Sequence, residues 1–412
     1  MIQWIKIAFR NILKNKRRSL VTLLAIAMGF AAVSLFQGYT NNIYKELRIS
    51  AVSEEGLGHL TIYKKGWSEK GKIEPDLYMF SKQEVRRIIE LAKEEPEVIL
   101  ATPQIHISGL ASNGRISTIF IATGVVADDD RIIKGDRIES LPIKGDFLND
   151  RDYYGVEMSE ELAKMLSLKV GSDAVVMATT LDGQMNALNI QVSGIYNTGT
   201  EATNDKYIRF LLPLAQSLYD TEKADQIVVL LNDWKKTDQV RISLLRRLSE
   251  AGISCEIKTW NELSSYYRQV KQMFDMIFMF IYCIVLIIVI MSVINTMGTA
   301  VLERTREIGT LRALGIKQRG VNLLFAIEGA MLGFWGSIAG IVLNIAIWGF
   351  ILMIKPTYIP PGLSSPVPLV INLVPSFLFS LMVFLILLSL LAAILPARRA
   401  ARLKVVDALG HV

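Results

Sequence analysis

The stretch MIFMFIYCIVLIIVIMSVINTMGTAVL, residues 276–302, decides the fold class of this sequence. It contains no Asp, Glu, Lys or Arg over its whole length. The hydrocarbon core of a bilayer is roughly 30 Å thick, and about 20 residues cross it as an α-helix. The stretch is therefore long enough and apolar enough to form a transmembrane helix.

Three further stretches without a charged residue have the same character, and they cover residues 20–39, 329–354 and 373–397. The 412-residue chain is 51% hydrophobic and only 20% charged, and its mean hydropathy is +0.35. This length suggests two or three folded units, and the composition disfavours an ordinary soluble enzyme. A long polar segment, residues 41–272, separates the first apolar stretch from the second.

Basic residues gather in three places that predict the orientation of the chain. Residues 1–19 hold six Lys or Arg and no acid, residues 303–320 hold five basic residues against two acidic ones, and residues 398–412 hold four against one. Segment 41–272 has 34 acidic and 29 basic residues. The positive-inside rule places both termini and residues 303–320 in the cytoplasm and segment 41–272 outside it.

The sequence therefore predicts a membrane protein with four transmembrane α-helices and a large extracytoplasmic α+β domain inserted between helices 1 and 2. The expected segments are a cytoplasmic amphipathic helix at 1–19, transmembrane helix 1 at 20–40, the extracytoplasmic domain with two subdomains at 41–272, transmembrane helix 2 at 273–302, a cytoplasmic helix or loop at 303–320, transmembrane helix 3 at 321–354, an extracytoplasmic loop at 355–372, transmembrane helix 4 at 373–397 and a cytoplasmic tail at 398–412.

The first apolar stretch could instead be a cleaved signal peptide, because a basic region precedes it and small residues such as Ala31 and Ala32 lie within it. It is uncharged from Ser19 to Tyr44, which is longer than the apolar region of about 7–15 residues in a signal peptide. No cysteine follows it for lipidation. We therefore expect it to be retained as a span.

Apolar and basic residues occupy different faces of a helix predicted ahead of this span. The apolar set is Ile2, Ile5, Phe9, Ile12 and Leu13, and the basic set is Lys6, Arg10, Lys14 and Arg17. Such a helix is typical of one that lies along the inner headgroup layer. Alternatively, the basic residues only fix the orientation of the chain.

Short β patterns and helical patterns alternate in segment 41–272. Strands are expected at 60–64, 105–110, 117–126, 174–179, 189–196, 227–231 and 254–258, and helices at 82–94, 159–166, 236–251 and 260–274. The pairs Asn113-Gly114 and Asp182-Gly183 favour tight hairpin turns. The helix at 260–274 is expected to run without interruption into transmembrane helix 2.

The sequence offers no motif for catalysis or metal binding. The three histidines, His59, His106 and His411, lie far apart, and Cys255 and Cys283 are not expected to pair. A Gly-rich phosphate-binding loop is absent, so no ATPase of its own is expected, and no bound cofactor and no nucleic-acid partner are expected.

Two features of the polar segment admit alternative interpretations. The run Asp128-Asp129-Asp130 could hold a cation, although an acidic run is more often solvated surface. Four methionines could line an apolar groove for adaptable binding, or they could simply belong to the core. These methionines are Met158, Met165, Met177 and Met185.

Four glycines in the third span lie on one helix face, because they are separated by four, three and four residues. They are Gly329, Gly333, Gly336 and Gly340. Missing side chains let another helix approach closely, either in the same bundle or in a dimer. Glu328 precedes them, and an acid near membrane depth indicates a paired or functional position, or a place at the inner headgroup level. In the second span, Ser292, Asn295 and Thr296 can form hydrogen bonds between helices.

Three motifs give the chain a resemblance to a known family. They are ERTREIGTLRALG at 303–315 followed by Glu328-Gly329 and the glycines, PARRAAR at 396–402 with VDAL at 406–409, and GVEMSEELA at 155–163 with KVGS at 169–172. Together with the order of one span, a large outer domain and three spans, they resemble the FtsX-type permeases of the MacB/LolC/LolE/FtsX superfamily of ABC transporters. The size and layout are most similar to the lipoprotein-releasing LolC/LolE permeases, since MacB carries a fused ATPase and FtsX usually has a smaller outer domain.

The resemblance implies a location in the bacterial inner membrane and a particular set of partners. These are two copies of a separate cytoplasmic ATPase that binds ATP and Mg²⁺, a second permease copy or a paralogue, membrane lipid, and a periplasmic protein or lipoprotein substrate. Residues 303–315 would form a coupling helix on the ATPase, ended by Gly315. The coupling residues would be Glu303, Arg304, Glu307, Ile308, Leu311, Arg312 and Leu314. A simple orientation-fixing loop is the alternative.

Three functions follow as hypotheses. The first is a permease subunit that couples ATP hydrolysis by its partner to conformational work outside the membrane, such as the release of lipoproteins or other amphipathic molecules. The second is an FtsX-like signalling subunit that regulates a periplasmic cell-wall hydrolase. The third is a membrane-anchored sensor or binding protein that has no ATPase.

Overall fold

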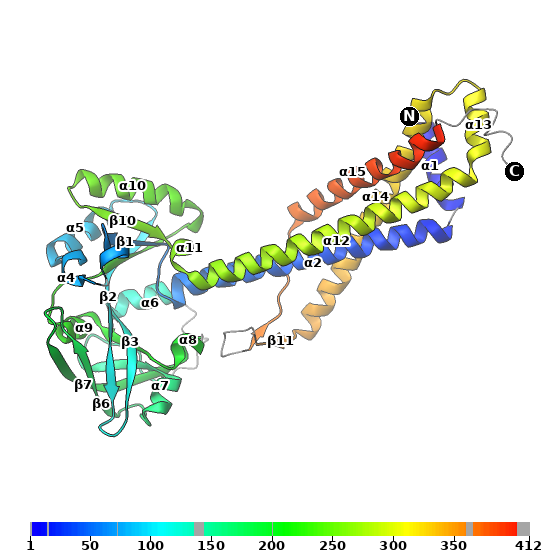
Figure 1. The fold of residues 1–412 in the computed structure, drawn as a ribbon. Coiled ribbons are helices and arrows are strands. Elements are labelled where there is room, and N and C mark those ends of the chain that lie inside the picture. The colour runs from blue at the N-terminus through cyan, green and yellow to red at the C-terminus, as the bar shows by residue number, and fades with distance from the viewer. Residues whose placement is uncertain are drawn as a thin grey trace. The chain divides into compact units, whose positions relative to one another are not determined.

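The computed structural model describes residues 2–14, 16–71, 73–135, 144–199, 201–359 and 366–401. It divides into two compact units (Figure 1). The helical unit comprises Met1–Tyr44, Val270–Thr357 and Pro368–Val412, and the α+β unit comprises Lys45–Gln269 and Tyr358–Val367. The C-terminal motif from Arg402 onward and His411 lie outside the described residues.

Over the residues that the structure describes, six helices build the helical unit. They are α1 (Ile2–Lys14), α2 (Lys16–Ile49), α12 (Ser265–Glu303), α13 (Thr305–Ala313), α14 (Gln318–Ile354) and α15 (Pro375–Ala401), of which α2 and α12 also extend into the α+β unit. Four of them are long and apolar enough to cross a membrane, over Lys16–Glu54, Ser265–Glu303, Gln318–Ile354 and Pro375–Arg399. These four contain the four uncharged stretches of the sequence to within two residues, so the predicted number of spans is confirmed.

The interior of the helical unit is apolar and draws on all four long helices. Ile26 and Phe30 of α2, Val293 of α12, Phe325 of α14 and Leu385 of α15 are all almost fully buried in one cluster. Each helix therefore turns one face toward its neighbours, and the opposite face is left apolar and exposed.

The α+β unit is built on one extended sheet. Its strands are β1 (Leu60–Lys64), β2 (Val98–Ser112), β3 (Ser117–Val125), β4 (Lys144–Gly145), β5 (Gly155–Ser159), β6 (Asp173–Thr179), β7 (Met185–Tyr196), β8 (Tyr207–Leu211), β9 (Gln226–Leu231) and β10 (Cys255–Thr259). Their order is β10-β1-β9-β2-β3-β8-β5-β7-β4, and β6 pairs with β2 and β7. The short strands β11 (Thr357–Tyr358) and β12 (Val367–Pro368) pair with each other.

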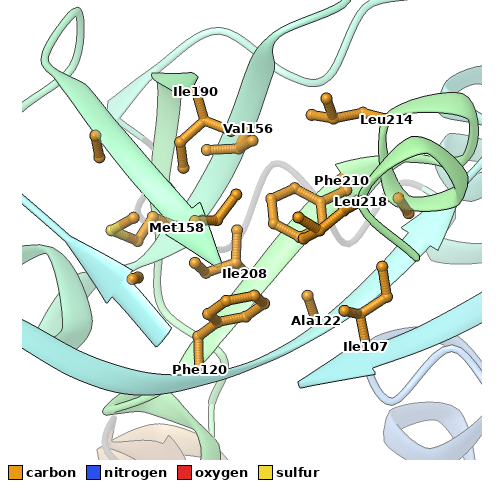
Figure 2. Packing of buried hydrophobic residues seen from close by; sticks show 14 of the residues in the cluster. Ile107, Phe120, Ala122, Val156, Met158, Ile190, Ile208, Phe210, Leu214 and Leu218 are labelled. Atoms are coloured by element: carbon orange, nitrogen blue, oxygen red, sulfur yellow. The ribbon is translucent and has the colours of Figure 1, made fainter. Parts of the chain in front are cut away.

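Two separate apolar cores lie along this sheet. The first joins β1, β9 and β2 to α5 (Lys82–Lys93) and α10 (Thr237–Glu250), with Leu60, Ile62, Ile88 and Leu244 fully buried. The second fills the space between β2, β3, β5, β7 and β8 and the helix α9 (Leu212–Tyr219), and Phe120, Met158, Ile208 and Phe210 belong to it (Figure 2). Because β2 contributes to both cores, it connects the two halves of the unit.

The remaining helical segments of the α+β unit are short. They are the π-helical turn Ser50–Glu54, α3 (Trp67–Lys70), α4 (Pro75–Tyr78), α6 (Ala127–Lys134), α7 (Glu160–Met165), α8 (Glu201–Asn204), the 3₁₀ turn Trp234–Lys236 and α11 (Trp260–Leu263).

The hairpin turns follow the chemistry of their sequences. Gly114 and Gly183 both have positive φ values, +84° and +81°, which glycine adopts without steric cost. The side-chain oxygen of Asn113 accepts hydrogen bonds from the backbone N–H groups of Arg115 and Ile116. The two hairpins predicted at these positions, β2–β3 and β6–β7, are confirmed.

Strand β2 and helix α12 differ from the prediction. β2 begins at Val98 rather than at residue 105, because Val98–Gln104 pairs with β9, a partner far away in the sequence. The helix expected at 260–274 is broken at Ser264, whose backbone is extended. The Ser264 hydroxyl accepts from the Tyr267 N–H and donates to Glu55, so it caps the start of α12 instead of continuing α11.

Candidate coupling site

Helix α13 forms within the segment that the sequence marked as a coupling element. Arg304 departs from helical geometry and separates α12 from α13. At the other end, Gly315 has φ +95°, its N–H donates to Arg312 O, and the Ile316 N–H donates to Leu311 O. This pair of bonds is the Schellman motif, in which a left-handed glycine ends a helix. The prediction that Gly315 ends this helix is confirmed.

A buried ion pair anchors the start of α13. Arg304 Nη1 lies 3.1 Å from Glu328 Oε1, and the two residues are only 8% and 2% exposed. Asn11 of α1 completes the site, because its side-chain amide donates to Glu328 Oε1 at 2.5 Å and its carbonyl accepts from Arg304 Nη2 at 3.1 Å. The cluster therefore joins α1, the α12–α13 junction and α14 at one point.

The other acids of the segment lie at the surface. Glu303 pairs with Arg18, and Glu307 lies 3.5 Å from Lys14. All four side chains are about half exposed or more, so these pairs add little stability, roughly 0–1 kcal/mol each. Their main consequence is that the basic N-terminal residues and α13 are neighbours.

The residues predicted to couple α13 to an ATPase divide into a buried face and an exposed face. Ile308 is only 5% exposed and packs in the apolar core of the helical unit, and Arg304 is held by Glu328. The resemblance assigned both to the coupling helix; within the chain they face the bundle rather than the surface, and their role in coupling stays a prediction. Leu311 and Arg312 are half-buried, whereas Glu307 is exposed and Leu314 is 78% exposed. The face with Glu307 and Leu314 is therefore the exposed one, and it is the face that can contact a partner.

The four glycines of α14 serve two different contacts within the chain. A Cβ at Gly329 would lie 2.6 Å from Ser389 O, and one at Gly333 would lie 2.9 Å from Ile386 Cα, both on α15. A Cβ at Gly336 or Gly340 would instead meet Ile26 or Phe30 of α2, at 2.7 Å and 2.6 Å. The stripe therefore packs α14 between α15 and α2, and a second copy of the chain would have to dock elsewhere.

Hydrogen bonds between helices accompany these close contacts. Thr22 of α2 lies 2.6 Å from the Thr296 hydroxyl of α12 and also accepts from Ser292 at 3.3 Å. The Asn344 amide of α14 donates to the Ser34 hydroxyl of α2. The predicted interhelical roles of Ser292 and Thr296 are confirmed, whereas Asn295 is exposed on the other face of α12.

The α+β unit contains a buried charge cluster that sequence reasoning missed. Arg209 of β8 pairs with Glu157 of β5 and lies 3.7 Å from Asp130 of α6, which in turn lies 2.5 Å from Lys134. Burial opposes the ionisation of Asp130, but Lys134 and Arg209 outweigh it and lower its pKa. Asp130 is therefore not solvated surface; Asp128 is exposed and fits that interpretation, and Asp129 is half-buried.

Two further titratable groups of the α+β unit, His59 and Cys255, are held in unreactive states. Burial, followed by the charge of Arg48, lowers the pKa of His59 to about 4, and His59 Nδ1 accepts from the Leu231 N–H. Burial raises the pKa of the Cys255 thiol to about 11, which disfavours the reactive thiolate. Within the described ranges, no three His, Cys, Asp or Glu side chains are grouped so that they could hold a metal ion.

The four methionines divide between the core and the surface. Met158 is fully buried, Met177 is half-buried, and Met165 and Met185 are 49% and 70% exposed. Met177 pairs across the sheet with Leu110, which pairs with Ile119 in the next strand. Leu110 and Ile119 are 40% and 65% exposed, so the outer face of this sheet carries an apolar row.

Two family profiles match the chain. The MacB-like periplasmic core domain matches residues 19–246, which is more than half of the chain, and the FtsX-like permease C-terminal domain matches residues 279–405. The first match covers most of α2 and most of the α+β unit, and the second covers most of α12 together with α13, α14 and α15.

Several permeases are similar over nearly the whole of this chain. The uncharacterized ABC transporter permease YvrN of Bacillus subtilis is 22% identical, with both chains fully covered. The lipoprotein-releasing system transmembrane protein LolC of Neisseria meningitidis is 20% identical over 95% of this chain and 94% of its own. The macrolide export ATP-binding/permease protein MacB of Campylobacter jejuni is 24% identical over 98% of this chain, which spans 61% of that protein.

The crystal structure of the periplasmic region of MacB from Actinobacillus actinomycetemcomitans matches 54% of this chain and 95% of that chain, at 15% identity and a TM-score of 0.37. With the four spanning helices and the two family matches, the chain is an inner-membrane protein with a large periplasmic domain. It belongs to the family of ABC transporter permeases that combine a MacB-like periplasmic core domain with an FtsX-like permease domain.

Proposed function

We propose that this chain is the permease subunit of an ABC transporter whose ATPase is a separate cytoplasmic protein. Two copies of this ATPase, which binds ATP and Mg²⁺, dock on the permease. The observation that carries this proposal is the asymmetry of α13. One face is locked into the bundle by Ile308 and by the Arg304–Glu328 pair, and the other is exposed beside basic residues. A helix held in this way can receive force from a docked motor.

The exposed face of α13 has the chemistry of a docking surface. Leu314, 78% exposed, provides an apolar anchor beyond the end of the helix, and Arg306 and Thr310 are exposed on the same short helix. Truncation of a central apolar anchor usually costs more binding energy than removal of a charge at the rim. Leu314 is therefore the main contact that we assign to the ATPase, and Glu307 sets the register.

The Arg304–Glu328–Asn11 cluster supplies the route from α13 into the membrane. A displacement of α13 must move Arg304, and Arg304 is bonded to α14 through Glu328 and to α1 through Asn11. Because an ion pair away from water is costly to separate, the three elements are expected to move together. The motor then acts on α14, which the glycine contacts join to α15 and α2.

The substrate that we propose is an amphipathic molecule such as a lipoprotein, released at the periplasmic side. The names of two relatives support this class, since one is a lipoprotein-releasing protein and another a macrolide exporter. The apolar row through Ile119, Leu110 and Met177 supports it as well, because an exposed apolar strip on a polar domain suits an amphipathic ligand or its carrier.

Leu314→Asp tests the docking proposal. We expect a loss of ATPase co-purification and of permease-stimulated ATP hydrolysis of about tenfold or more, because an unpaired carboxylate would be buried in the contact. The matched control is Leu77→Asp in the α+β unit, the same substitution at a residue that is 64% exposed. Equal ATPase binding by the two variants would contradict the role of α13.

The substrate proposal is tested by isolating the permease with its ATPase from membranes and identifying the bound molecules. Lipid-modified proteins that leave the complex on ATP addition, and that bind less to Ile119→Lys than to the parent, are the expected result. Activation of a cell-wall hydrolase by the complex, without any bound lipidated molecule, would instead indicate the FtsX-like signalling function.

A further inference from the structure

Helix α1 packs on the helical unit with one face and exposes the other. Ala8 is fully buried, and Ile12 packs against the apolar core of this unit. Asn11 lies on the same face and bonds to Glu328 and Arg304. Positions 8, 11 and 12 form one side of a helix, because residues three and four apart are neighbours on its surface. The opposite side of α1 is therefore turned away from the bundle.

The outward side of α1 combines basic and apolar residues. Lys6, Arg10 and Lys14 are exposed and follow one another at intervals of four residues, so they form a row along the helix. At 3.6 residues per turn, Ile7 lies on one side of this row and Phe9 on the other. Ile7 is 46% exposed and Phe9 is 43% exposed. Such a helix suits the boundary between lipid headgroups and acyl chains, where phosphates and hydrocarbon lie next to each other.

The described acids at the end of the bundle that holds α1 and α13 all have a basic partner (Figure 1). The pairs are Glu303–Arg18, Glu307–Lys14 and Glu328–Arg304. Four exposed basic residues of α1 and of the first turn of α2 are left without a counter-ion among the described residues. They are Lys6, Arg10, Lys16 and Arg17, and we call them the N-terminal basic surface. Negative charge that complements this surface has to come from outside the chain.

We propose that anionic phospholipids of the inner leaflet bind the N-terminal basic surface and thereby regulate the coupling site. Their phosphates pair with the four basic side chains, and Ile7 and Phe9 enter the adjoining hydrocarbon. An acidic protein also offers negative charge. The apolar residue on each side of the basic row favours lipid instead, because a lipid surface presents phosphate and hydrocarbon together.

Asn11 connects the lipid to the coupling site. Its side-chain amide donates to Glu328 and its carbonyl accepts from Arg304, the residue that separates α12 from α13. An α1 that is held in the headgroup layer keeps this cluster assembled, so anionic lipid increases the stimulation of the ATPase. The effect on the ATPase rests on the proposed function, whereas the binding of lipid does not.

Binding of phosphatidylglycerol with a fluorescent acyl chain to the full-length permease, in a nonionic detergent and without any ATPase, tests the lipid site. We expect tighter binding than for phosphatidylcholine with the same label. The test variant combines four substitutions, Lys6→Gln, Arg10→Gln, Lys16→Gln and Arg17→Gln. It should raise the dissociation constant for phosphatidylglycerol about tenfold or more, because each basic group near an anionic lipid strengthens binding several-fold. Arg10→Gln alone, a single change at the surface, should raise it about threefold.

The matched control removes the same number of charges from other exposed positions of the helical unit. It combines Lys317→Gln, Arg319→Gln, Arg398→Gln and Arg399→Gln, and its dissociation constant should stay close to the parent value. Equal weakening by the two fourfold variants, an unchanged constant for the first, equal binding of both lipids by the parent, or displacement of the lipid by inorganic phosphate alone would each overturn the lipid site.

The regulatory step is tested with the permease and its ATPase in vesicles of phosphatidylcholine with or without phosphatidylglycerol. We expect the parent to stimulate ATP hydrolysis more strongly when phosphatidylglycerol is present, and the variant lacking the N-terminal basic surface to lose this difference. Equal stimulation in both kinds of vesicle, despite selective lipid binding, would overturn the regulatory role. A complete lack of stimulation in either kind of vesicle would instead contradict the proposed function, so the two failures are distinguishable.

Discussion

The two units of the chain bury polar side chains in different ways. In the α+β unit, two basic and two acidic groups share one interior site beside a large apolar core, with Arg209 at its centre. In the helical unit, hydroxyl and amide groups such as Thr22, Thr296 and Asn344 meet between helices, and Arg304–Glu328 is the buried ion pair among the described residues.

The difference reflects the two solvents. The α+β unit folds in water, where apolar burial drives folding and charges left inside must neutralise one another. The long helices meet in lipid, where apolar surface gains little from burial, so close backbone contact and hydrogen bonds hold them together. The helical unit therefore relies on close helix contacts at the glycines of α14, and the α+β unit places a cluster of four neutralising charges in its interior.

Replacement of Arg209 is expected to have the largest effect on stability. Arg209→Met leaves Glu157 and Asp130 buried with only Lys134 as a counter-charge, and we expect a loss of roughly 3–5 kcal/mol. Hydrogen exchange of β5 and β8 in the full-length protein should accelerate accordingly. Arg87→Met is the control, because Arg87 is exposed beside Glu90 and should matter by less than about 1 kcal/mol. Similar exchange in both variants would mean that the cluster is not a stabilising element.

Glu328→Gln tests whether the Arg304–Glu328 ion pair only stabilises the helical unit or also transmits force from the ATPase. The neutral amide leaves the Arg304 charge without a counter-ion, and we expect a loss of about 2–3 kcal/mol together with weaker stimulation of the ATPase. Thermal denaturation in detergent and ATP hydrolysis are the measurements. Glu222→Gln, which removes an exposed pair with Lys82 in the α+β unit, should leave both values within error. A purely structural role would be indicated by lower stability with unchanged stimulation.

Gly333→Ala tests the claim that missing side chains hold the helical unit together. The new Cβ would lie 2.9 Å from Ile386 Cα, a backbone atom that cannot move aside, so we expect a cost of about 1–3 kcal/mol. Gly333→Leu should prevent bundle assembly. Gly349→Ala is the control on the same helix, because its Cβ meets nothing within 4 Å and alanine favours the helix. If Gly349→Ala were the more damaging change, the packing argument would fail.

His59 should give the α+β unit a modest sensitivity to acid. Its pKa in the folded state, about 4, lies below the value of about 6.5 for an unfolded chain, so protonation favours unfolding. The contribution of neutral His59 to the free energy of unfolding is fully present above about pH 6.5. It decreases as the pH falls toward 4, by about 1–2 kcal/mol at pH 5. His59→Asn can still accept the Leu231 N–H but does not titrate, so its urea midpoint should vary less between pH 7.5 and 5. An identical slope would assign the effect to another group.

Local signals in the sequence predicted the elements that depend on near neighbours. The apolar stretches marked the spans, Asn113-Gly114 and Asp182-Gly183 marked hairpins, and Gly315 marked the end of α13. Each of these depends on backbone preference or on apolarity over a few consecutive residues. For the same reason the break at Ser264 could have been found, because serine followed by a long helical pattern is a common helix start.

Tertiary structure decided which side chains of these elements face inward. Arg304 and Ile308 were indistinguishable in the sequence from their exposed neighbours, and only the contacts with Glu328 and the bundle core bury them. Asp130 lies in an acidic run and is buried because Arg209, far along the chain, lies beside it. The sequence by itself determined the four spans, their orientation and the class of the outer domain, since these follow from composition and charge. Pairing between distant residues decided the inward face of α13 and the charge cluster, because a side chain's partner depends on the whole fold rather than on its neighbours in the sequence.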